Sequence, residues 1–347
     1  MKGFDEYKLI KNINPRDQLI MGFIELPSDK LLALGRKGNI DIYDMKNNFK
    51  HFYSVPKLNK NNPRTKIIFL SNGYFATTSE EGPIEILDIN LEKKETLIIQ
   101  QLEGHKSSSY DILELSNGKL VSVSNNGQIL FWEYDPTTNL FKLFKEMNEH
   151  PNEYSQLLED KKRNLLICSP CFDSQGTAII DLETFSVLKK FEDIAGNGSN
   201  EIIMISDKIV LDNSAADEVG LFFIDLDKKE IIKHDKNFNE NRTVCFLKLK
   251  NGYLLASVVV GDRNDFDLDS DEEDDNENFN EEDDEKEEKI NEKFHCDIQT
   301  IKILDNGEKL LTVNTKSCVD YAPIISIIEL NDGKIVTGSN RIKVYEL

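Results

Sequence analysis

The chain repeats itself about every 45 residues, and this period constrains its fold more than any other feature. A turn followed by a short apolar run recurs as SDKLLAL, SNGYFAT, SNGKLVS, KRNLLIC, SDKIVLD, KNGYLLA and DGKIVTG. The residues just before these runs are spaced by 44, 45, 45, 44, 45 and 81 positions, at Asp29, Gly73, Gly118, Arg163, Asp207, Gly252 and Gly333. A fixed period of this length predicts seven copies of one supersecondary unit.

Each unit contains about four short runs rich in β-branched and aromatic residues, separated by Gly, Asn or Asp turns. The run after the second turn alternates, as in GNIDIYD (38–44), GPIEILD (82–88) and NRIKVYE (340–346). No long 3.6-residue periodicity interrupts the pattern, so helices should be few. Four strands per unit at this period are typical of propeller blades. The sequence predicts an all-β fold, with residues 1–347 forming a single seven-bladed β-propeller.

The two ends of the chain complement each other. The seventh unit stops at Leu347 without a fourth strand, while YKLIKNIN (7–14) resembles the fourth strand FKLFKEMN (141–148) of the third unit. We therefore expect an N-terminal strand, about residues 6–14, to complete blade seven and leave no open sheet edge in the ring.

The irregular interval of 81 contains an acidic insertion. Residues 265–288 hold sixteen acidic residues and one lysine, whereas the whole chain has a formal net charge of −21. Such charge density cannot be buried, which predicts a disordered insertion over 264–293, between the second and third strands of blade six. It imitates a calcium loop but has Ser270 where the turn needs glycine and Asn276 where a glutamate belongs. Ser270, followed by Asp-Glu-Glu, is a candidate site for an acidophilic kinase.

The third unit resembles the WD-repeat (WD40) β-propeller family. It carries Gly104-His105, strand serines at 122 and 124, and a closing Trp132-Glu133. In the family a histidine, a serine or threonine, an aspartate and the tryptophan form a hydrogen-bonded staple within a blade. The resemblance implies this structural role for His105, Ser124, Asn126 and Trp132, with Asn126 in the place of the aspartate. The other units lack the tryptophan, so a propeller of another family is the alternative.

Motifs for chemistry are sparse. Cys168-Ser-Pro-Cys171 is half of a zinc site or a redox pair, but no second pair accompanies it, and we expect one buried strand cysteine and one loop cysteine. The histidines at 51, 105, 150, 234 and 295 fall in different units. We find no recurring carboxylate or histidine in phase with the blades. The sequence therefore assigns no catalytic, cofactor-binding or metal-binding residue. The alternative is a propeller-type hydrolase or metal-dependent enzyme with its site at the central channel.

The remaining expectations concern partners and location. The acidic balance argues against direct nucleic-acid binding, since phosphate needs basic surface. No apolar run is long enough to span a membrane, and the N-terminus lacks the apolar core of a signal peptide, so we expect a cytoplasmic or nuclear protein. The resemblance implies a non-catalytic interaction scaffold or adaptor subunit. We expect a monomeric propeller within a hetero-complex, with basic proteins attracted by the acidic insertion.

Overall fold

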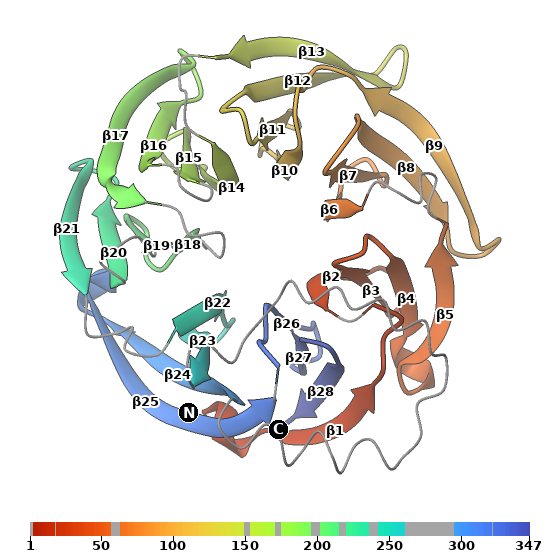
Figure 1. The fold of residues 1–347 in the computed structure, drawn as a ribbon, viewed down its shortest axis with the longest axis vertical. Helices are drawn as coiled ribbons and strands as arrows, with labels where there is room; N and C mark the ends of the chain where they lie inside the picture. The colour runs from red at the N-terminus through yellow and green to blue at the C-terminus, as the bar shows by residue number, and fades with distance from the viewer. Residues whose placement is uncertain are drawn as a thin grey trace.

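The computed structural model describes residues 3–17, 19–56, 63–148, 153–170, 175–195, 202–214, 220–235, 242–260, 295–320 and 322–347. Over these residues the strands form seven four-stranded antiparallel sheets arranged as a ring (Figure 1). In each sheet one strand lies at the centre of the ring and one at its circumference. The predicted all-β, seven-bladed propeller is confirmed.

The blades are numbered by chain order, each from its inner to its outer strand. Blade one comprises β2 (Ile20–Leu26), β3 (Lys30–Gly35), β4 (Ile40–Asp44) and β5 (Lys50–Val55), and blade two comprises β6 (Arg64–Phe69), β7 (Phe75–Ser79), β8 (Ile84–Asn90) and β9 (Glu95–Leu102). Blade three comprises β10 (Ser109–Glu114), β11 (Leu120–Ser124), β12 (Ile129–Asp135) and β13 (Leu140–Met147). Blade four comprises β14 (Tyr154–Asp160), β15 (Leu165–Pro170), β16 (Gln175–Asp181) and β17 (Ser186–Ala195).

Blades five to seven follow the same order. Blade five comprises β18 (Ile202–Met204), β19 (Ile209–Ser214), β20 (Gly220–Asp225) and β21 (Glu230–Asp235). Blade six comprises β22 (Arg242–Lys248), β23 (Tyr253–Val260), β24 (His295–Leu304) and β25 (Lys309–Asp320). Blade seven comprises β26 (Ser326–Glu329), β27 (Ile335–Gly338), β28 (Ile342–Glu346) and β1 (Lys8–Ile13). Short 3-10 turns occur at η1 (Phe4–Glu6), η2 (Met45–Asn47) and η5 (Asp305–Gly307).

The ring closes as the sequence predicts. Strand β1 pairs antiparallel with β28, with Leu9 opposite Tyr345 and Ile13 opposite Ile342. Blade seven is therefore built from both ends of the chain (Figure 1). This pairing removes the free edge that β28 would otherwise present to another sheet.

A feature that the sequence did not reveal lies just before β1. Phe4 in η1 is 1% exposed, and its ring lies 5.6 Å from that of Tyr7 and 5.1 Å from that of Tyr345. Its backbone N–H donates to Oγ1 of Thr300 in blade six at 2.9 Å. The N-terminal segment thus packs between blades six and seven in addition to pairing with β28.

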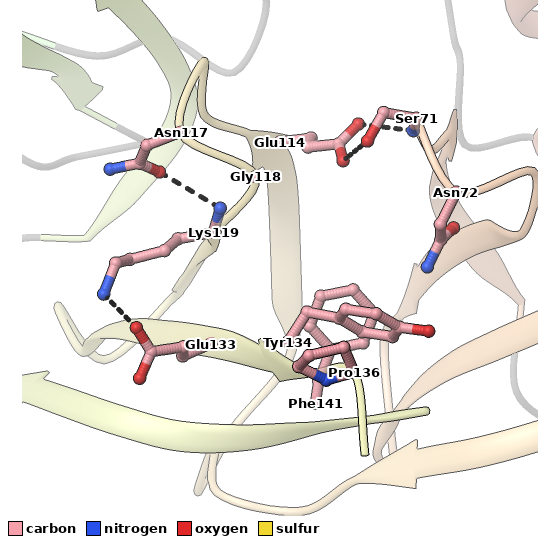
Figure 2. A pocket seen from close by; sticks show the side chains of 10 residues that line it. All are labelled: Ser71, Asn72, Glu114, Asn117, Gly118, Lys119, Glu133, Tyr134, Pro136 and Phe141. Atoms are coloured by element: carbon pink, nitrogen blue, oxygen red, sulfur yellow. Dashed lines mark hydrogen bonds and ion pairs between the residues drawn. The ribbon is translucent and has the colours of Figure 1, made fainter. Parts of the chain in front are cut away.

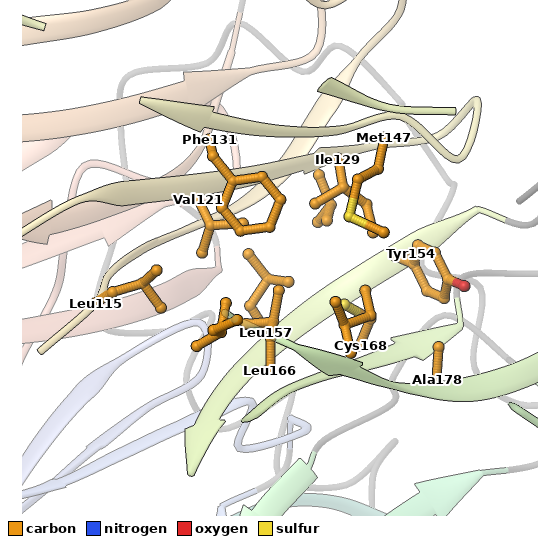
Figure 3. Packing of buried hydrophobic residues seen from close by; sticks show 13 residues of the cluster. Leu115, Val121, Ile129, Phe131, Met147, Tyr154, Leu157, Leu166, Cys168 and Ala178 are labelled. Atoms are coloured by element: carbon orange, nitrogen blue, oxygen red, sulfur yellow. The ribbon is translucent and has the colours of Figure 1, made fainter. Parts of the chain in front are cut away.

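The hydrophobic core is divided among the blade junctions. Each apolar cluster joins residues of two neighbouring blades, and the cluster between blades three and four is drawn in Figure 3. There Phe131 and Ile129 of β12 face Leu157 of β14 and Cys168 of β15. Because side chains on the two faces of a strand alternate, Trp132 points the other way and packs between blades two and three.

Two faces of the ring can be distinguished by their connections. The turn face carries the links between first and second strands and between third and fourth strands; the loop face carries the others. Gly118 shows why the turns recur: its φ of 81° lies in the left-handed region, which glycine adopts without strain. Every internal residue outside the described ranges falls in a loop-face connection, so the turn face is described in full.

Residues 261–294, which include the predicted acidic insertion, lie outside the described residues, as does Ser270. The strands that flank them are β23 and β24, the second and third of blade six. The predicted position of the insertion is therefore confirmed.

Candidate functional site

The structure brings His105 and Trp132 of blade three together through a serine that is not the predicted one, and it leaves Asn126 exposed. Nε2 of His105 lies 2.7 Å from Oγ of Ser122, and Nε1 of Trp132 donates to the same oxygen at 3.0 Å. Ser122, rather than Ser124, therefore joins the histidine to the tryptophan. Ser124 is two residues nearer the following turn, and its hydroxyl donates to Oδ1 of Asn126 at 2.5 Å. Asn126 closes this turn by also accepting from the backbone N–H of Gln128.

Burial determines the protonation of this cluster. It lowers the pKa of His105 to about 4, and the nearby Gln128 amide opposes the shift only partly. His105 is therefore neutral at pH 7, and Trp132 is 2% exposed. The geometry is that of an internal tie between the turn before β10 and the sheet of blade three.

Blade five places a carboxylate where blade three has its bridging serine. Trp132 pairs with Leu120 and Ile224 with Val210, so Ser122 and Asp212 occupy equivalent positions. Asp212 is fully buried, accepts from Oγ1 of Thr177 at 2.6 Å and lies 3.4 Å from Oγ of Ser169, both in blade four. Burial raises its pKa to about 7, against the opposing effect of the two hydroxyls.

The cysteine and histidine candidates do not converge. Cys168 is a buried free thiol in the blade three–four core, where burial raises its pKa, while Cys171 lies outside the described residues. Among the residues that the structure describes, no group of three His, Cys, Asp or Glu side chains could hold a metal ion. Within that same part of the chain, no helix has the length and apolar character needed to cross a membrane.

Carboxylates do recur in phase with the blades, contrary to the sequence-based expectation. The end of the inner strand carries Glu25, Glu114, Glu159 and Glu329 in blades one, three, four and seven. Each accepts a backbone N–H from the turn of the preceding blade. The donors are Asn331 to Glu25 at 2.8 Å, Ser71 to Glu114 at 2.8 Å, Ser116 to Glu159 at 2.9 Å and Lys250 to Glu329 at 2.7 Å.

These contacts, here called glutamate latches, join each of the four carboxylates to the preceding blade. They lie at the turn face and bond to backbone at the junctions between blades seven and one, two and three, three and four, and six and seven. The junction between blades one and two lacks both groups, since Pro27 has no N–H and Phe69 stands in the place of the glutamate. The signal was visible in the sequence as a glutamate at the same place of the repeat, followed by leucine in Glu25-Leu26, Glu114-Leu115 and Glu329-Leu330.

A pocket opens on the turn face between blades two and three. Its volume is about 320 Å³, near the lower end of the roughly 300–1,000 Å³ of small-molecule sites. Figure 2 shows Tyr134 and Pro136 on one side and Glu114 with Ser71 on the other. The lining residues are Ser71, Asn72, Glu114, Asn117, Gly118, Lys119, Glu133, Tyr134, Pro136 and Phe141.

The walls of this blade 2–3 pocket are held by hydrogen bonds. Oε1 of Glu114 accepts from the Ser71 hydroxyl at 2.6 Å, in addition to the latch. The Gln100 side chain bonds both the N–H and the C=O of Phe141, at 2.8 and 2.6 Å, and so joins β9 to β13. Nζ of Lys119 donates to Glu133 at 2.6 Å. The pocket therefore combines an aromatic wall with carboxylates in fixed positions.

Comparison with known proteins bears on the fold. No protein-family model matches the sequence, and no curated protein matches it. A search of solved structures does give matches. The WD40 β-propeller domain of Doa1 superimposes with a TM-score of 0.62 over 99% of this chain and 98% of its own, at 12% sequence identity. The chain has the WD40 β-propeller fold. At this identity the likeness concerns the WD40 fold alone, and it confirms the fold that the third unit predicted.

Proposed function

We propose that the protein is a non-catalytic protein-interaction scaffold that binds its partner on the turn face, around the blade 2–3 pocket. The observation that carries the proposal is the pocket together with exposed apolar side chains on the outer strands of the two blades that form it. Leu97 and Ile98 of β9, and Leu143 and Phe144 of β13, are 59%, 36%, 47% and 47% exposed. Exposed apolar groups around a pocket with a charged border are typical of protein-binding surfaces.

The surface is also rigid before any partner arrives. The glutamate latches from Glu114 and Glu159 fix the turns of blades two and three on either side of the pocket. A surface that is already ordered loses less conformational freedom on binding, which favours affinity. Domains with the WD40 fold typically act as protein-interaction scaffolds, and a rigid ring with variable turns suits that role.

The acidic insertion gives the proposal a second element. Residues 265–288 carry most of the formal net charge of −21. We infer that basic proteins are the partners, because a charge of this size raises their association rate at low salt. In this proposal the chain is a monomeric propeller in a hetero-complex of the cytoplasm or nucleus, and it binds no nucleic acid directly.

Site-specific photo-crosslinking tests which face binds. A photoreactive residue would replace Asn72 at the pocket, or Asn340 on the loop face as a matched control, in the full chain and in a chain lacking residues 264–293. After irradiation in native lysate, adducts would be identified by mass spectrometry. We expect a protein adduct at position 72 and none of that partner at position 340.

Two results would change the proposal. Equal adducts at both positions, or none at position 72, would overturn the assignment to the turn face. An adduct at position 72 that disappears with the deletion would show that the acidic insertion recruits the partner. An adduct that persists would show that the propeller surface recognises it without the insertion.

A further inference from the structure

We propose that the partner binds through a basic amphipathic helix, which lies along the facing sides of the outer strands β9 and β13. Figure 1 shows these strands in succession at the circumference of the ring. The inference rests on the proposed function, because this surface begins at the blade 2–3 pocket and continues the same docking site outward. It goes further by naming the structure and the charge of the segment that binds there.

The strand register shows which apolar side chains face this junction. Leu143 lies opposite Trp132, and Leu97 lies opposite Asp88. Trp132 belongs to the core between blades two and three, and so does Ile86, two residues from Asp88. Residues opposite one another in neighbouring strands share a face, as do alternate residues of one strand. Leu143 therefore faces blade two, and Leu97 faces blade three.

These two side chains extend the apolar wall of the pocket. Tyr134 and Phe141, which line the pocket, lie opposite each other with their rings 5.1 Å apart. Leu143 follows Phe141 by two residues on the same strand and is 47% exposed, while Leu97 is 59% exposed. These four residues are here called the β9–β13 strip. Apolar side chains exposed next to a pocket mark an interaction surface.

Carboxylates flank the strip at both ends. Glu95 precedes Leu97 by two residues on β9 and shares its face. Glu146, near the other end of β13, lies opposite Leu130 of the same core and so faces blade two. Hydrogen bonds from side-chain amides lower the pKa of Glu146, and the charge of Lys106 does so to a smaller extent. Glu146 is therefore ionised at pH 7.

The cations of β13 face away from the strip. Lys142 and Lys145 lie opposite Glu133 and Phe131, respectively, and Phe131 belongs to the core between blades three and four. Strand β9 contains no lysine or arginine. The facing sides of these two outer strands thus carry carboxylates without a cation, which attracts a basic segment. The side of β13 toward blade four carries lysines and would repel it.

Backbone hydrogen bonding favours a helix over an added strand. The Gln100 side chain accepts from the N–H of Phe141 at 2.8 Å and donates to its C=O at 2.6 Å. These edge groups of β13 are therefore not available to a strand from the partner, whereas a helix satisfies its own backbone and needs only an apolar stripe. The eight residues of β13 extend over about 26 Å, which accommodates a helix of about four turns.

The test uses the purified full chain and a synthetic probe. The probe is the capped, dye-labelled peptide KKALKALLKALAKK, which places its leucines on one helical face and lysines elsewhere. Three comparison peptides carry glutamate for every lysine, proline for two central alanines, or the same residues with leucines spread around the helix. Fluorescence anisotropy gives Kd. We expect the probe to bind, and each comparison peptide to have a Kd about tenfold higher or more.

Two pairs of adjacent residues supply matched control variants. Leu143 and Phe144 are both 47% exposed, but the Phe144 ring lies 5.7 Å from that of Phe185 in blade four. Leu97 and Ile98 are adjacent too, but Ile98 lies opposite a residue of the core between blades one and two. Leu143→Ser and Leu97→Ser should each raise the Kd of the probe about fivefold to tenfold. Phe144→Ser and Ile98→Ser should change it less than about twofold.

The charge of the surface is tested in the same way. Glu95→Gln combined with Glu146→Gln should raise the Kd of the probe about threefold to fivefold at low salt, and the difference should shrink at high salt. Glu133→Gln, on the side toward blade four, should leave Kd nearly unchanged. Thermal unfolding of every variant would confirm that it folds.

Several outcomes would overturn the inference: no binding of the probe, equal effects within either matched pair, equal or tighter binding of the glutamate peptide, or unchanged binding of the proline peptide. None of them would affect the crosslinking result at Asn72, which tests the docking of a protein by itself. A partner crosslinked at Asn72 together with equal effects within the matched pairs would leave the scaffold proposal standing without the β9–β13 strip.

Discussion

Glu159 of blade four accepts three hydrogen bonds from Ser116 of blade three, two from its backbone N–H at 2.9 and 3.0 Å and one from its hydroxyl at 2.6 Å. One carboxylate thus satisfies both donors of a residue in the neighbouring blade. The contact crosses a junction that also holds an apolar cluster and a bond from the Leu157 N–H to Asp111 at 2.8 Å, and it fixes the position of one blade's turn relative to the next.

Replacing this carboxylate should loosen the junction. Glu159→Ala is expected to lower the free energy of unfolding by about 1–2 kcal/mol, since hydrogen bonds to charged groups are stronger than neutral ones but this one is partly exposed. Chemical denaturation measures the change. Glu230→Ala serves as the control, because Glu230 is exposed and makes no side-chain hydrogen bond to any described residue. Equal effects of the two variants would show that the latch contributes nothing.

The staple of blade three makes a second prediction. Trp132→Ala should cost about 3–5 kcal/mol, as large core truncations do. Ser122→Ala should cost about 1–3 kcal/mol, because it leaves the Trp132 N–H buried without its acceptor. Ser124→Ala should cost less, since its hydroxyl bonds only within the adjoining turn. Thermal and urea unfolding would rank the three; a greater loss for Ser124→Ala would return the bridging role to Ser124.

Asp212 predicts how stability depends on pH. Its pKa is raised from 3.8 to about 7 in the folded protein. The folded state therefore binds the proton on the Asp212 carboxyl more tightly than the unfolded state does. The stability that this protonation contributes is lost as pH rises from about 4 to about 7. By linkage the loss amounts to about 4 kcal/mol at most. Asp212→Asn removes it and should raise the unfolding temperature relative to the unaltered chain at pH 8 but not at pH 4.

The quantity to compare at each pH is the difference in unfolding temperature between Asp212→Asn and the unaltered chain. His105 has a lowered pKa of about 4, so its contribution has the opposite sign and is lost as pH falls through the same range. His105 is common to both proteins and cancels in the difference. A difference in unfolding temperature that does not change between pH 4 and pH 8 would contradict the assignment to Asp212.

The burial of Phe4 predicts how much its side chain stabilises the closed ring. Its side chain is 1% exposed and packs against Tyr345, so Phe4→Ala should cost about 3–5 kcal/mol. Leu97→Ala, at a 59% exposed position on β9, should change stability by less than about 0.5 kcal/mol. Differential scanning calorimetry of both variants tests this. A small effect of Phe4→Ala would mean that β1 pairing alone closes the ring.

Most of the fold could be predicted from the repeat period of the sequence. The period located the blades, and the missing fourth strand of the seventh unit located the closure by β1. The site was less accessible for physical reasons. Ser122 and Ser124 lie on the same face of β11, and only the register of β11 with β12 distinguishes them. The blade 2–3 pocket combines the Ser71 turn with Tyr134, which lie more than sixty residues apart, so no local motif indicates it.

The latches also divide the blades into chemically different kinds although their backbones are alike. Glu114 and Glu159 present acceptors to the preceding turn, whereas Lys248 at the equivalent place in blade six donates to the carbonyl of Ile205 in blade five at 3.0 Å. At the junction between blades one and two, Pro27 has no N–H to donate and Phe69 has no side-chain oxygen to accept. A unit with a glutamate at this place could not exchange with blade six or blade two without losing these contacts. The order of the blades around the circle is therefore specified by the chain and could not be permuted freely.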